Sequence, residues 1–138
     1  MAIERHDFAS SEALAEALAD AVANDLTEGI AARGAGVLAV SGGSTPKRFF
    51  KALSSHAIDW SNVFVTLVDE RWVEPSSDRS NAKLVQDLLL TGDAVYALQP
   101  DSQPLLELLR LPGEVSIFVL QEDTSARGLQ SVADRVQT

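Results

Sequence analysis

Apolar residues change their spacing along the chain, and each spacing predicts a different element. Over Ser11–Arg33 an apolar residue returns every fourth position, at Leu14, Leu18, Val22, Leu26 and Ile30. This period predicts an amphipathic helix that packs against a sheet. Ser10 or Ser11 can cap the start of this helix, and Gly34 can end it.

Two short apolar runs, at residues 36–40 and 63–68, contain no charged side chain. Such runs are typical of strands that are buried on both faces. Between them we expect a second helix that begins at Pro46, with Thr45 as its cap. A third helix is predicted after a polar loop, capped by Ser80 or Asn81 and closed by Gly92.

Alternating strands and helices with short connections imply parallel strands joined by right-handed crossovers. We therefore predict an α/β fold with an open, doubly wound, mostly parallel sheet and helices on both faces, complete or truncated. One domain is expected over residues 1–138. After Gly92 we expect a short strand, a short helix, a buried strand and a weakly periodic last helix, at residues 94–98, 104–111, 115–120 and 124–136.

The charge balance narrows the class of partner. The chain has 20 acidic and 11 basic residues and a net charge of −9, which disfavours nucleic-acid binding. It lacks a run of about 18 apolar residues that would cross a membrane, and residues 1–7 do not have the order of a signal peptide. We expect a cytoplasmic protein whose partner is a small molecule, with neither a nucleic acid nor a membrane as partner.

Two polar segments, at residues 41–46 and 69–72, follow the two predicted strands. In open parallel sheets, ligands bind beyond the carboxyl ends of the strands. If the two strands are neighbours, both segments face one crevice, and this crevice is the predicted site.

The first segment suits a phosphate or an oxyanion. Gly42 and Gly43 let the backbone approach a ligand, and Ser44 and Thr45 offer hydroxyl groups. The following helix directs the positive end of its dipole at the same place. The alternative is a tight strand-to-helix turn with ordinary capping.

The second segment carries three charges and an indole. Arg71 can bind a phosphate or a carboxylate with two parallel hydrogen bonds. Asp69 can orient a water molecule or a sugar hydroxyl, or act as a base. The alternative is a surface ion pair at the end of a strand, and Trp72 is interpreted as a packing residue rather than a sugar platform.

The two histidines of the chain, His6 and His56, lie outside the predicted crevice and are interpreted as surface or structural residues. Their spacing forms no metal-binding motif, and the chain has no cysteine. We therefore expect no metal site.

These segments together resemble the 6-phosphogluconolactonase family, within the larger group that includes the glucosamine-6-phosphate isomerases. The resemblance covers about residues 8–92 and depends on residues 38–46 (LAVSGGSTP), 65–73 (VTLVDERWV) and 78–81 (DRSN). Residues 70–73 favour the lactonase branch, because an aromatic residue usually replaces Arg71 in the isomerase branch.

The resemblance implies hydrolysis of 6-phospho-D-glucono-1,5-lactone, in the oxidative pentose phosphate pathway, without a metal or an organic cofactor. It implies that the sugar-phosphate site is lined by Gly42, Gly43, Ser44, Thr45, Arg71 and Asn81. It places Asp69 beside the reacting ring, as the catalytic candidate.

One family feature is missing from the chain. The family carries a later Gly-Met-Gly-x-Asp-Gly-His-Thr segment whose histidine is the favoured general base, whereas this chain has no histidine after His56. We therefore expect this chain alone to hydrolyse the lactone poorly. The alternatives are a non-catalytic sugar-phosphate-binding module and an isomerase or deaminase with Asp69 as the base.

Overall fold

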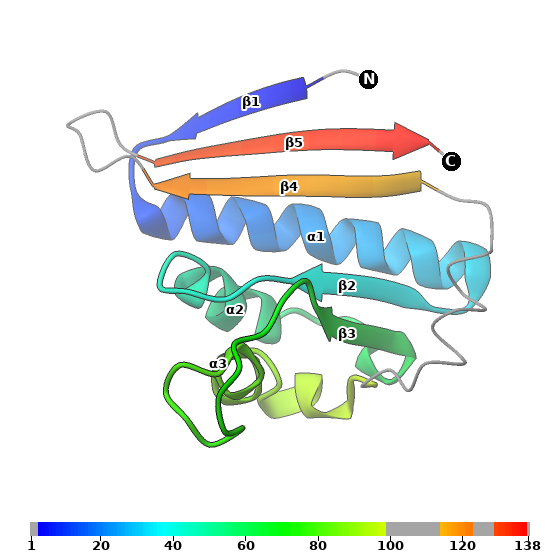
Figure 1. The fold of residues 1–138 in the computed structure, drawn as a ribbon. Coiled ribbons are helices and arrows are strands. Elements are labelled where there is room, and N and C mark those ends of the chain that lie inside the picture. Colours follow the sequence, from blue (N-terminus) through cyan, green and yellow to red (C-terminus); the bar gives the residue numbers. More distant parts are fainter. Residues whose placement is uncertain (1–2, 99–113, 123–128, 138) are drawn as a thin grey trace.

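A strand–helix–strand unit lies at the centre of the computed structural model, which describes residues 3–98, 114–122 and 129–137 (Figure 1). It consists of β2 (Gly36–Val40), α2 (Lys47–Ser54) and β3 (Val63–Leu67). The two strands pair in parallel, from Gly36 opposite Val63 to Val40 opposite Leu67. Parallel strands joined by a helix confirm the predicted α/β class.

The first predicted helix is α1 (Ser11–Arg33). Ser10 caps it by accepting a hydrogen bond from the Ala13 backbone N–H at 3.1 Å. Gly34 ends it in the left-handed region, at φ 82°, which favours glycine because that residue has no Cβ atom. Both the predicted cap and the predicted stop are confirmed.

One hydrophobic core joins α1 to the strand–helix–strand unit. The largest side chains with almost no exposed surface are Phe50, Leu53, Val63 and Leu89. The α1 stripe at Leu14, Leu18, Val22 and Leu26 is also buried, and Ile30 packs at the edge of the core. None of the described helices combines the length and the apolar character needed to cross a bilayer.

A second sheet contains β1 (Ile3–Phe8), β4 (Glu114–Glu122) and β5 (Leu129–Gln137). Its strand order is β1-β5-β4, and both pairings are antiparallel. α1 contacts strands of both sheets (Figure 1). The strand expected at residues 115–120 is confirmed within β4, and the sequence pattern did not indicate β1.

The helix expected over residues 124–136 is wrong for residues 129–137. These residues form β5, which pairs with β1 on one edge and with β4 on the other. Two neighbouring strands satisfy the backbone groups of β5, and this pairing overrides a weak local helical period.

Three short helices complete the described structure: η1 (Trp60–Asn62), α3 (Asn81–Leu88) and η2 (Gly92–Tyr96). Ser80 caps α3, as predicted, but the helix ends at Leu88, before Gly92. The strand expected at residues 94–98 is wrong for η2, and only Leu98 pairs with β3, by an isolated bridge to Phe64. The helix expected at residues 104–111 lies outside the described residues.

His56 links the end of α2 to α1. Its Nε2 lies 2.6 Å from Asp20 Oδ1, and its Nδ1 lies 2.9 Å from the Ala52 carbonyl oxygen. The hydrogen bond with Asp20, followed by the one with Ala52, raises the pKa of His56 above 6.5. His56 is therefore a structural residue.

The raised pKa of His56 predicts a pH-dependent contribution to stability. A group whose pKa is higher in the folded state stabilises fully below its unfolded pKa, here about 6.5. That stabilisation is lost as the pH rises through the folded value. Asp20→Asn should therefore lower the free energy of unfolding more at about pH 6 than at about pH 9. Urea unfolding at both pH values tests this, and an equal loss at both would contradict it.

Candidate functional site

The segments after β2 and β3 lie side by side at one edge of the parallel pair. The Val68 N–H donates to the Val40 carbonyl oxygen at 2.8 Å, which carries the pairing up to the residue before each segment. Residues 41–46 (the first wall of the predicted crevice) and residues 69–72 (its second wall) therefore follow neighbouring strands (Figure 1).

Asn81, the first residue of α3, connects the two walls. Its Nδ2 donates to the Asp69 carbonyl oxygen at 3.2 Å and lies 3.5 Å from Asp69 Oδ1. A Cβ atom built on Gly42 would lie 1.9 Å from Asn81 Oδ1, so the Gly42 backbone packs directly on the amide. Asn81 is 4% exposed. The structure thus brings together three predicted site residues from three segments.

Glu70 fixes the start of α3 from the same crevice edge. Its Oε1 accepts hydrogen bonds from the backbone N–H groups of Arg71 (2.8 Å) and Asn81 (2.7 Å). Its Oε2 accepts from the Ala82 N–H (2.9 Å) and the Ser80 hydroxyl (3.0 Å). The backbone N–H groups of Ala82, Arg71 and Asn81 lower the pKa of Glu70 to about 2.

Sequence reasoning missed this role of Glu70. Capping motifs are recognised at short sequence spacing, whereas Glu70 is ten residues from Ser80 along the chain. The one signal in the sequence was an acidic residue at a strand end, and that position alone does not indicate which helix it caps.

The glycine-rich segment enters α2 differently from the prediction. The helix begins at Lys47, Pro46 occupies the cap position, and no side-chain cap bond is formed there, so the expected cap by Thr45 is wrong. Pro46 has helical dihedrals and lacks a capping side chain, which explains the shift. Gly43 adopts φ 97°, a value that favours glycine. In the described structure the N–H groups that open α2 have no side-chain partner, an arrangement suited to an anion.

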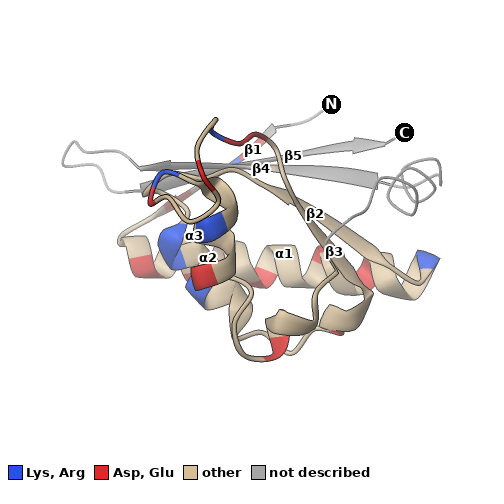
Figure 2. Cartoon of the chain, turned by 60° about the horizontal axis from the view of Figure 1, so that its bottom comes forward, with Lys and Arg blue, Asp and Glu red and all other residues tan. Residues whose placement is uncertain are grey.

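Basic residues concentrate on α2, which carries Lys47, Arg48 and Lys51 and no acidic residue (Figure 2). Arg48 is held by the Ser11 hydroxyl at 2.8 Å and by the Glu12 carboxylate. Within the described ranges, Lys47 forms no ion pair. A local positive region therefore exists on a chain with a net charge of −9.

Arg71 and Trp72 are exposed on the second wall. Arg71 forms no ion pair with any described residue, so the alternative of an ion pair at the strand end is not observed for Arg71. Trp72 is 104% exposed in the described structure, so its interpretation as a packing residue is wrong.

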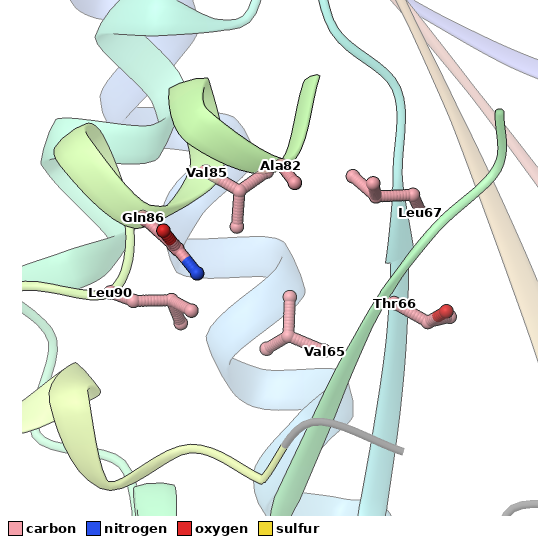
Figure 3. Close-up of a pocket in the computed structure, with 7 residues that line it drawn as sticks. All are labelled: Val65, Thr66, Leu67, Ala82, Val85, Gln86 and Leu90. Atoms are coloured by element: carbon pink, nitrogen blue, oxygen red, sulfur yellow. The ribbon is translucent and has the colours of Figure 1, made fainter. Parts of the chain in front are cut away.

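A cavity of ≈ 240 Å³ lies between β3 and α3 and does not include the crevice loops (Figure 3). Its lining residues are Val65, Thr66, Leu67, Ala82, Val85, Gln86 and Leu90. Val65, Val85 and Leu90 point toward one another, so its character is mainly apolar. The residues that line this cavity include no charged side chain. Across the described ranges, no group of three or more potential metal ligands occurs.

The chain is similar in sequence and structure to known 6-phosphogluconolactonases. Residues 9–122 match the family model described as glucosamine-6-phosphate isomerases/6-phosphogluconolactonase. A 6-phosphogluconolactonase of Rhizobium meliloti is 58% identical over 97 residues, which are 70% of this chain and 42% of that protein. One of Pseudomonas putida is 43% identical over 96 residues, with 70% and 40% covered.

A crystal structure of a 6-phosphogluconolactonase from Shewanella baltica superposes with a TM-score of 0.66 at 47% identity. The superposition covers 67% of this chain and 40% of that one. The chain thus spans about two fifths of the length of these relatives.

Proposed function

The chain belongs to the family of glucosamine-6-phosphate isomerases and 6-phosphogluconolactonases, and from this premise we propose that it binds 6-phospho-D-glucono-1,5-lactone for hydrolysis to 6-phosphogluconate. The observation that carries the proposal is the contact of Asn81 with both Gly42 and Asp69. This contact holds the glycine-rich first wall (residues 41–46) next to the charged second wall (residues 69–72).

The phosphate is assigned to the loop of the first wall. Gly42 and Gly43 expose backbone, Ser44 and Thr45 supply hydroxyl donors, and α2 begins there without a side-chain cap. These groups favour a dianion, because N–H groups at a helix start and hydroxyls donate hydrogen bonds to its oxygens. Binding energy from the phosphate can then orient the distant lactone carbonyl.

The reacting end of the substrate is assigned to the second wall. Hydrolysis adds water to the lactone carbonyl, and the water proton leaves while negative charge develops on the carbonyl oxygen. The C–O bond to the ring oxygen then breaks, and that oxygen takes up a proton. Arg71 can stabilise an anionic oxygen, and Asp69 can orient the attacking water.

One observation favours a second function, that of a sugar-phosphate-binding module without turnover. His56 is bonded to Asp20, and His6 lies in β1, 3.6 Å from Glu4, so neither histidine serves the crevice. Glu70, with its pKa near 2, is a weak base. The isomerase or deaminase alternative is less well supported, because the similar proteins reported above are 6-phosphogluconolactonases.

Binding of 6-phosphogluconate is the first expected result. A ligand at about one hundred times its Kd should stabilise the fold by about 2.7 kcal/mol, because it binds the folded state alone. A thermal scan of the chain with and without the ligand measures this shift. Gluconate without the phosphate is the matched control, and an equal shift with both ligands would contradict the assignment of the phosphate to the loop.

Variants of Arg71 test whether the second wall contacts the ligand, by the same measurement of 6-phosphogluconate binding. Arg71→Ala should weaken binding by about 1.5–3 kcal/mol, the range for charge-assisted hydrogen bonds, and Arg71→Lys should recover a part. Unchanged affinity in both variants would remove Arg71 from the site.

A further inference from the structure

We propose that Glu70 is a positioning residue of the crevice, which holds Asn81 against Gly42 and Asp69 by fixing the first turn of α3. The inference depends on the proposed function, because it assigns Glu70 a part in phosphosugar binding. Glu70 lies between Asp69 and Arg71 in sequence, yet its carboxylate is directed at the start of α3.

The Glu70 carboxylate has four hydrogen-bond donors. Both oxygens of Glu70 accept two hydrogen bonds each, at 2.7 to 3.0 Å. The donors come from two segments: Arg71 in the loop after β3, and Ser80, Asn81 and Ala82 at the start of α3. A single side chain thus joins these two segments.

Asn81 is one of these donors. Its backbone N–H is bound to Glu70, and its side-chain amide contacts Asp69 and packs on Gly42. Loss of the Glu70 carboxylate would free the first turn of α3. The side-chain amide of Asn81 would then lose its contacts with Asp69 and Gly42. Glu70 therefore acts on the crevice through Asn81.

The starts of the helices differ in their capping side chains. α1 is capped by Ser10 alone, whereas α3 has Ser80 and also Glu70. Two side chains therefore bind the start of α3, against one at the start of α1. The negative charge of Glu70 also occupies the positive end of α3, whereas α2 begins without a side-chain cap. A ligand phosphate is accordingly directed to α2.

The test is a double-mutant cycle on the affinity for 6-phosphogluconate, measured by calorimetry on folded samples of the chain. Glu70→Gln should weaken binding about tenfold, the effect of losing one or two hydrogen bonds. Asn81→Ala should weaken it similarly, and Glu70→Gln should cause no further loss in the Asn81→Ala background. Asp59→Asn is the matched control, because Asp59 accepts hydrogen bonds from Ser61 and Asn62 before β3, at the opposite end of that strand from the crevice, and its loss should lower stability alone.

Each outcome separates the inference from the function on which it depends. Wild-type affinity in Glu70→Gln, with Arg71→Ala weakened, would overturn the inference and leave the proposed function intact. Losses that add in the double variant would also overturn it, since Glu70 would then act independently of Asn81. Absence of binding by the unsubstituted chain would overturn the proposed function first. If Glu70→Gln does not fold, Glu70→Asp enters the same cycle, because it keeps the charge and shortens the reach.

Discussion

The chain of 138 residues is expected to hydrolyse 6-phospho-D-glucono-1,5-lactone about 10²–10⁴-fold more slowly than a lactonase with a positioned general base, the typical contribution of such a group. His56 is hydrogen-bonded to Asp20, and the Glu70 carboxylate already accepts hydrogen bonds from four donors. Asp69 is the remaining carboxylate of the second wall. A coupled assay measures the rate, after subtraction of the spontaneous opening of the lactone.

Two variants, Asp69→Asn and His56→Gln, test this expectation. A rate clearly above the spontaneous one that Asp69→Asn abolishes would contradict it and make Asp69 the base. His56→Gln is the control, because it changes a residue bonded to α1 and should leave any such rate unaltered.

Gly42→Ala is expected to have the other large effect, a loss of both phosphosugar binding and stability. The added methyl group would lie 1.9 Å from Asn81 Oδ1 and 2.4 Å from Asn81 Cγ, far inside van der Waals contact. Overpacking of this kind typically costs about 1–3 kcal/mol, because the buried Asn81 amide must leave Asp69 or the loop must move. Urea unfolding and calorimetry with 6-phosphogluconate measure the two losses.

A second substitution identifies the cause of this loss. Asn81→Ala removes the atoms that the new methyl group would meet, so the double variant should recover much of the stability lost in Gly42→Ala. Gly43→Ala provides a comparison, since its Cβ atom would meet no atom within 4 Å and its cost comes from φ 97° alone. Equal losses for the two glycine variants, with no recovery in the double variant, would refute the steric explanation.

The parallel core could be predicted because its signals are local. The period of α1 and the uncharged runs of β2 and β3 each report burial through residues close in sequence. A general rule on parallel sheets placed the predicted site at the loops after β2 and β3, which the structure shows to follow paired strands. The prediction that Thr45 caps α2 was wrong because Pro46 itself occupies the cap position.

The contacts that define the crevice could not be predicted in the same way. Glu70 binds Ala82 and Asn81 packs on Gly42 across segments that no local pattern connects. β5 likewise acquires its conformation from two paired strands, of which β1 is far away in sequence. The roles of Asp69, Arg71 and the loop residues stay predictions until binding is measured.

The uncapped start of α2 links ligand occupancy to local unfolding. Helix ends fray first, and a helix without a capping side chain opens at a lower free energy than one with two caps. A bound phosphate would supply the missing acceptors, so the first turn of α2 and the ligand would become ordered in one event. Part of the binding free energy is then used to order this turn. Amide exchange at Arg48 and Phe49 would therefore slow as the bound fraction of the protein rises.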